Sequence, residues 1–95
     1  MIPLQSERFG RLAELLADVP FNTYFASSVI EGMILGEAYA DNAESPTVCL
    51  VVHSYGMSLL LGAHDNREVN AWIRRYMLNS DGQRKRPEWM QIHPL

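Results

Sequence analysis

The fold is decided by residues 36–62, which read GEAYADNAESPTVCLVVHSYGMSLLLG. This stretch predicts three short strands, at 36–41, 47–53 and 58–62, because β-branched and apolar residues recur there between groups of turn-forming residues. The middle strand carries the strongest signal, a run of apolar residues that follows Pro46. These three strands predict an antiparallel meander.

The turn between the second and third strands predicts their pairing. With a two-residue loop at 55–56, Leu50 would face Leu61 across the hairpin. The other face of the hairpin would carry Cys49, Val51 and Leu60. Because both faces of the sheet are then apolar, each must be covered by helices or by another domain.

Two helices are predicted before this stretch. Ser6 can cap a first amphipathic helix that ends at residues 18–20, Asp-Val-Pro, since the residue before a proline is pushed out of the α region. Asn22 can cap a second helix, and Gly32 can end it by taking a left-handed conformation.

A third helix and a last strand are predicted after it. Residues 64–78 combine a capping-box spacing, Asp65 to Glu68, with an apolar stripe at helical spacing. Residues 88–94 predict a strand whose place in the sheet stays open. The order ααβββαβ predicts one α+β domain over residues 1–95, a three-stranded antiparallel meander plus a fourth strand, packed with about three helices.

Composition and charge exclude several classes of protein. The chain has 47% hydrophobic and 20% charged residues, a net charge of −3 and a single cysteine, Cys49. No apolar run approaches the roughly 20 residues that span a bilayer, and no internal disulfide can form, so we expect a cytoplasmic protein without a membrane partner. Although residues 67–95 are net basic, the acidic balance of the whole chain argues against nucleic-acid binding. The basic end is typical either of a partner-facing surface or of a solvated helix face plus loop.

No residue pattern predicts a catalytic, cofactor-binding or metal site. Cys49 and His53 are four residues apart on one strand, about 13 Å, which is too far for a nucleophile and its base. The three histidines lack the spacing of metal ligands. Glu37 and Asp41 lie on one face of their strand, again about 13 Å apart. This spacing does not predict a pair of catalytic carboxylates, and solvated surface residues explain both. The candidate pocket or interface residues are Asn22, Glu31, Asp41 and His53.

The turn and packing residues form a pattern of their own. An Asn-aromatic helix ends near Glu-Gly, a strand ends in Asp, a Pro-led strand follows, and an apolar strand ends in Gly before Asp-Asn. The residues at these positions are Asn22, Glu31, Gly32, Asp41, Pro46, Gly62, Asp65 and Asn66. Together with PEWMQIHP near the end, residues 20–93 resemble in this way the N-terminal portion of the GNAT-type acetyltransferase family that includes the zwittermicin A resistance protein.

The resemblance implies an acetyl-CoA-dependent family, but it places the coenzyme site outside this chain. GNAT enzymes hold the pyrophosphate with Gln/Arg-x-x-Gly-x-Gly/Ala, whose amides lie at a helix N-terminus, and in the family this motif belongs to the C-terminal lobe. Residues 33–38, MILGEA, have Met33 at the Gln/Arg position and lead into a strand. The resemblance therefore implies an accessory N-terminal lobe without its catalytic lobe. Such a lobe would bind no cofactor, would not be catalytic by itself, and would dock and help to shape a substrate pocket.

Two other interpretations stay open. The chain can be a standalone interaction domain that forms homo-oligomers or binds a protein partner. It can also be a small enzyme that uses His53 or Glu31 in a pocket between copies. The expected partners are thus a catalytic GNAT lobe or a second copy of the chain.

Overall fold

The computed structural model describes residues 1–17, 19–20, 23–84 and 87–94. Within these residues the chain is α+β, with three α-helices, a 3-10 helix and a five-stranded mixed sheet, which confirms the predicted class. The elements are β1 (Ile2–Pro3), η1 (Ser6–Leu12), α1 (Ala13–Ala17), α2 (Tyr24–Ile30), β2 (Gly36–Ala40), β3 (Val48–His53), β4 (Met57–Gly62), α3 (Arg67–Leu78) and β5 (Trp89–Pro94). The strand β1 was not predicted, because two residues carry no recognisable period.

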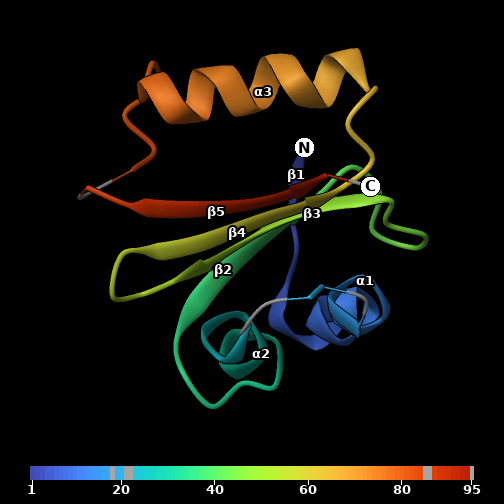
Figure 1. Cartoon of the computed structure of the whole chain (residues 1–95). Helices are drawn as coiled ribbons and strands as arrows, with labels where there is room; N and C mark the ends of the chain where they lie inside the picture. The colour runs from blue at the N-terminus through green and yellow to red at the C-terminus, as the bar shows by residue number, and fades with distance from the viewer. Residues whose placement is uncertain (18, 21–22, 85–86, 95) are drawn as a thin grey trace.

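The sheet lies between two helical layers (Figure 1). The helices α1 and α2 and the 3-10 helix η1 pack on one face, and α3 runs across the other. The larger core, under η1, α1 and α2, includes the fully buried Leu12, Val51 and Leu59. The expectation that both faces of the sheet are covered is thus confirmed, and helices provide the cover on each face. Among the described residues, no helix is long and apolar enough to cross a membrane.

The hairpin of β3 and β4 differs from the predicted register by one residue. Leu50 pairs with Leu60 rather than with Leu61, so the loop has three residues, 54–56. Gly56 has a φ of 91°, the left-handed conformation that closes a three-residue hairpin loop. The predicted split of the faces is therefore wrong for two residues. Leu60 packs toward α3 together with Leu50, and Leu61 packs in the other core with Cys49 and Val51.

Two predicted helix caps are also wrong. Asn66 rather than Asp65 caps α3, since its side-chain oxygen accepts a hydrogen bond from the amide of Val69 at 3.1 Å. Asparagine is as good a cap as aspartate, and the sequence alone does not choose between two neighbours. Ser6 lies inside η1, and the capping position is Gln5, because the chain stays extended from β1 up to that residue.

The last strand lies at the edge of the sheet, where it pairs with β4 in parallel (Figure 1). The strand order is β1-β2-β3-β4-β5, and the other neighbours are antiparallel. Two parallel neighbours need a crossover connection, which α3 provides. This crossover brings the residue before β5 close to the end of α3.

Candidate functional site

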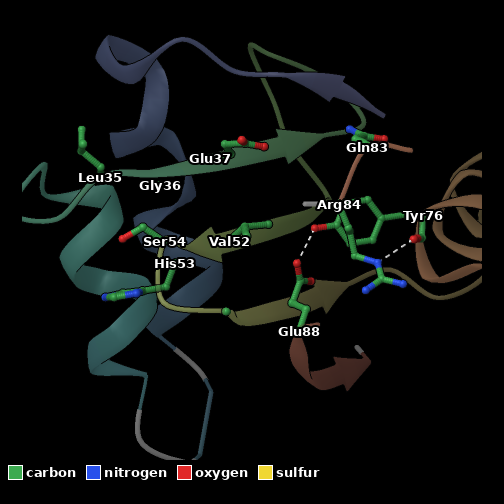
Figure 2. Close-up of a pocket in the computed structure, with 11 residues that line it drawn as sticks. Leu35, Gly36, Glu37, Val52, His53, Ser54, Tyr76, Gln83, Arg84 and Glu88 are labelled. Atoms are coloured by element: carbon green, nitrogen blue, oxygen red, sulfur yellow. Dashed lines mark hydrogen bonds between the residues drawn. The ribbon is translucent and has the colours of Figure 1, made fainter. Parts of the chain in front are cut away.

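A cavity of about 280 Å³ lies between the sheet and the C-terminal part of α3 (Figure 2). Its lining comes from the start of β2 and the residue before it, the end of β3 and the loop after it, one residue of α3, the loop after α3, and the residue before β5. The polar side chains that the site depends on are Glu37, Arg84 and Glu88, and Val52 and the Tyr76 ring supply apolar wall. Because these residues are far apart in sequence, the cavity is a product of the fold.

A cluster of three aromatic rings supports one wall of the cavity. Tyr39 of β2 lies with its ring centroid 5.1 Å from that of Trp72 and 6.3 Å from that of Tyr76. Trp72 and Tyr76, one turn apart on α3, stack with centroids 5.3 Å apart and an interplanar angle of 18°. Since Tyr39 and Tyr76 are both buried, this packing fixes the positions of their hydroxyl groups.

Each of these tyrosines donates a hydrogen bond to a glutamate of the cavity. Tyr39 donates to Glu37, two residues earlier on the same face of β2. Tyr76 donates to Oε1 of Glu88 at 2.7 Å, which Figure 2 shows as a dashed line. Burial and the bond to Glu37 raise the pKa of Tyr39 to about 12, and burial and the bond to Glu88 raise the pKa of Tyr76 too. Both hydroxyls therefore remain protonated donors at neutral pH.

The guanidinium of Arg84 hydrogen-bonds the last carbonyl groups of α3. Its Nε donates to the carbonyl oxygen of Tyr76 at 3.0 Å, and one terminal nitrogen donates to that of Met77 at 2.7 Å. Asn79, in the left-handed conformation at φ 55°, accepts the amide of Arg84 at 2.8 Å and so fixes this loop. A cation at the C-terminal end of a helix is stabilised by the helix dipole and by the last carbonyls.

His53, a predicted candidate, lines the cavity but its ring points away from Tyr76, Arg84 and Glu88 in Figure 2. The side chain is buried, and Nδ1 accepts a hydrogen bond from the amide of Tyr55 at 3.1 Å. An accepting Nδ1 carries no proton, so the neutral ring has its proton on Nε2. The geometry gives His53 a role in holding the β3–β4 loop.

Asp41, a second candidate, organises the connection from β2 to β3. It accepts hydrogen bonds from the Thr47 hydroxyl at 2.6 Å, the Thr47 amide at 2.9 Å and the Val48 amide at 3.2 Å. Burial alone would raise the pKa of Asp41, but these donors outweigh burial and hold the pKa below its ordinary value. Asp41 follows β2 at the opposite end from Gly36, which pairs with His53, so the fold does not bring the two candidates together.

Glu31, a third candidate, is not among the described residues that line the cavity. Glu31 follows α2 as an exposed residue, and its amide donates to the carbonyl oxygen of Ser27 at 2.9 Å. Asn22, including its predicted role as a helix cap, lies outside the described residues. Of the three predicted residues that the structure describes, His53 alone contributes to this lining, and its hydrogen bond holds the loop rather than the polar cluster.

Sequence reasoning missed Glu88, Tyr76 and Arg84 as a group. Tyr76 reads as one more apolar position of the α3 stripe, and Glu88 and Arg84 read as loop charges. An available signal was the Glu-x-Tyr spacing of Glu37 and Tyr39, which puts both side chains on one face of a strand.

Nucleophilic and metal chemistry find no support in the described residues. The thiol of Cys49 is fully buried, and burial raises its pKa to about 12, which leaves it protonated and unreactive. No three His, Cys, Asp or Glu residues in the described parts of the chain form a group that could hold a metal ion.

A second surface of interest is the outer edge of β5. No described strand pairs with this edge, and the segment Trp89–Pro94 contains no Asp, Glu, Lys or Arg. The side chain of Trp89 is 71% exposed and that of Ile92 is 52% exposed. Edge strands usually carry charges or short, bulged ends that prevent pairing, so an uncharged edge with exposed apolar residues is unusual.

Comparisons of the chain with protein-family models, with curated proteins and with solved structures each gave no match.

Proposed function

We propose that this chain is the accessory N-terminal lobe of a GNAT-like N-acetyltransferase. In this proposal the lobe is not catalytic by itself; it docks against a catalytic lobe that holds acetyl-CoA and helps to shape the substrate pocket. A cytoplasmic location belongs to the same proposal and is compatible with a single, buried cysteine.

The positions of the pattern residues at the ends of helices and strands support the proposed family. In the sequence pattern, a helix ends near Glu31-Gly32, a strand ends in Asp41, and an apolar strand ends in Gly62. In the structure the same residues follow α2, follow β2 and end β4. The segment MILGEA leads into β2 and opens no helix, so it offers no helix N-terminus for a pyrophosphate.

The observation that carries the docking function is the outer edge of β5. Its backbone groups on that side pair with no described strand, and Trp89 and Ile92 are exposed beside it. A partner lobe that adds a strand there would satisfy these backbone groups and bury both side chains. The commonest anchors of protein interfaces are large side chains such as tryptophan.

Calorimetric titration of the chain with the catalytic lobe of a zwittermicin A resistance-type acetyltransferase tests this proposal. We expect Trp89→Ser to raise the Kd at least about tenfold, because a buried tryptophan anchor commonly carries such a share of the binding energy. Met33→Ser is the matched control, since Met33 is 74% exposed but lies in the loop before β2, and β3 and β4 separate β2 from β5 in the sheet. Equal effects of the two variants, or no binding at all, would contradict the proposal. The chain alone should show no thermal shift with acetyl-CoA.

The same edge favours a second candidate, a standalone dimerisation domain. If two copies pair their β5 strands antiparallel about Gln91, Met90 of each copy lies opposite Ile92 of the other, on the α3 face. On the other face Trp89 lies opposite His93 of the second copy. This pairing brings apolar residues together and sets no like charges opposite each other.

Sedimentation equilibrium separates the two candidates. A dimer predicts self-association that Ile92→Lys removes, because a charge on an edge strand opposes pairing. The exposed control Met33→Lys should leave the association unchanged. A chain that stays monomeric at every concentration rules out the dimerisation domain and leaves the accessory lobe.

A further inference from the structure

Among the described residues that line it, the cavity between Glu37 and Glu88 has an excess of negative charge, which the proposed docking function does not use. Two carboxylates line it, and Arg84 is the described cation in its wall. Arg84 donates hydrogen bonds from Nε to the carbonyl oxygen of Tyr76 and from a terminal nitrogen to the carbonyl oxygen of Met77. Two of its donors are therefore committed to the end of α3, where a cation is stabilised.

The hydrogen bonds of the cavity leave accepting capacity on both of its glutamates. The hydroxyl hydrogens of Tyr39 and Tyr76 are already donated to Glu37 and Glu88. A carboxylate can accept several hydrogen bonds, and Oε2 of Glu88 is buried without a partner among the described residues. A buried polar atom of this kind is one of the rarer features of folded proteins and calls for an explanation. Glu37 is solvent-exposed, so an incoming ligand can reach it first.

Size and apolar surface narrow the class of ligand. A volume of about 280 Å³ lies below the usual range of pockets for drug-sized ligands, roughly 300–1,000 Å³. Val52 and the ring of Tyr76 add apolar wall beside the carboxylates. A short alkyl chain that ends in a positive charge matches both features.

We propose that the cavity between Glu37 and Glu88 binds a small organic cation, a primary ammonium group on a short alkyl chain. The ammonium has three donors and no acceptor, which complements carboxylates whose tyrosine partners have already given their hydrogens. Glu37 receives the charge at the mouth of the cavity, and Glu88 lines its wall below α3. This inference is independent of the acetyltransferase proposal, because it concerns binding by this chain alone.

Titration of the 95-residue chain with 1,4-diaminobutane, followed by amide nitrogen–proton NMR spectra, tests the proposal. We expect saturable shifts for the amides of residues 36–37, 52–56 and 83–84 and for Glu88. The matched neutral probe is 1,4-butanediol, which has the same chain length and no charge. Glu37→Gln and Glu88→Gln should each raise the Kd at least about tenfold, the usual effect of losing a charge-assisted hydrogen bond. Glu44→Gln, on an exposed carboxylate paired with Arg8 elsewhere, should leave the Kd unchanged.

Three results would overturn the proposal. One is equal shifts with 1,4-butanediol, which would show that charge is not recognised. Another is shifts spread over the whole acidic surface, with Glu44→Gln as damaging as Glu37→Gln. The third is no saturable shift at all. If Glu88→Gln unfolds the chain, Glu37→Gln decides alone, because an exposed glutamate at a strand surface can be neutralised without loss of the fold.

Discussion

Tyr76, near the end of α3, donates its hydroxyl hydrogen to Glu88, the residue before β5, at 2.7 Å. This bond closes the crossover that carries the chain from β4 through α3 to the sheet edge. It also places a glutamate against the aromatic cluster of Tyr39, Trp72 and Tyr76. The same contact therefore builds the wall of the cavity and holds β5 at its place.

Removing this hydroxyl should destabilise the chain. Tyr76→Phe leaves the half-buried Glu88 without its donor, and a buried acceptor that loses its partner costs about 1–3 kcal/mol in the free energy of unfolding. Urea denaturation measures the loss. Tyr55→Phe is the control, since Tyr55 is 79% exposed and should change stability little. A Tyr76→Phe variant as stable as the control would show that the bond does not hold the crossover.

Alkaline pH should weaken the fold through Tyr39. Below pH 10 the hydroxyl is protonated in both the folded and the unfolded chain, and its contribution to stability is fully present. Between pH 10 and about 12 the unfolded chain ionises first, because the pKa of the buried Tyr39 is raised to about 12, so the free energy of unfolding falls. Urea denaturation across this range should give a shallower fall for Tyr39→Phe. Parallel curves for the two proteins would contradict the raised pKa.

Asp41 should act as a structural residue with a measurable pH dependence. Asp41→Asn weakens three hydrogen bonds at the β2–β3 connection, and we expect a loss of about 1–2 kcal/mol. Because the pKa of Asp41 is lowered in the folded chain, its contribution is present above pH about 4 and is lost as the pH falls through the lowered pKa. Asp65→Asn is the matched control, as Asp65 is exposed and caps no helix. If both variants lose stability equally, Asp41 has no special role.

The thiol of Cys49 should resist modification in the native chain. It is fully buried in β3, and burial raises its pKa to about 12. With a thiol-specific disulfide reagent at pH 8, we expect labelling to follow the rate at which the sheet opens, and to become fast in 6 M urea (about the concentration that unfolds many small domains). Fast labelling without urea would place the thiol at the surface.

A methyl group at position 62 should not fit. Gly62 has a φ of 114°, and a Cβ there would collide with the carbonyl oxygen of Thr47, which bonds the amide of Ala63 at 3.0 Å. Gly62→Ala should lower the free energy of unfolding by at least about 2 kcal/mol, because backbone strain and collision add. Gly10→Ala, at a position with open space around it, should be neutral or stabilising. Equal stability of the two variants would contradict the close approach at Gly62.

Sequence analysis predicted the elements whose apolar residues recur at regular spacing over many residues, or whose ends are marked by clear turn residues. The apolar stripe of α3 and the valine-rich β3 reveal themselves by residue spacing, and Gly32 follows α2 with a φ of 77°, as expected. The hairpin register depended on whether the loop has two or three residues, and both fit Ser-Tyr-Gly-Met. A one-residue change moves Leu60 to the other face, so local turn chemistry decided what periodicity could not.

The candidate site could be predicted from the sequence less well than the fold. Glu37 and Glu88 line one cavity because β5 returns parallel to β4, and the sequence left the place of β5 open. Asp41 and His53 attract attention as polar residues at strand ends, yet their bonds are to the amides of nearby turns. In the sequence, a polar residue that hydrogen-bonds the amides of a turn cannot be distinguished from one that binds a ligand, because the distinction depends on its neighbours in the fold.

Amide hydrogen exchange of the chain, with and without the catalytic lobe of a zwittermicin A resistance-type acetyltransferase, tests the docking account most directly. The outer edge of β5 pairs with no described strand, so its outward amides should exchange fast in the chain alone. We predict that the catalytic lobe slows exchange between Trp89 and His93 and leaves α2 unchanged. Unchanged exchange in β5, with protection elsewhere or nowhere, would contradict the claim that this edge is the docking surface.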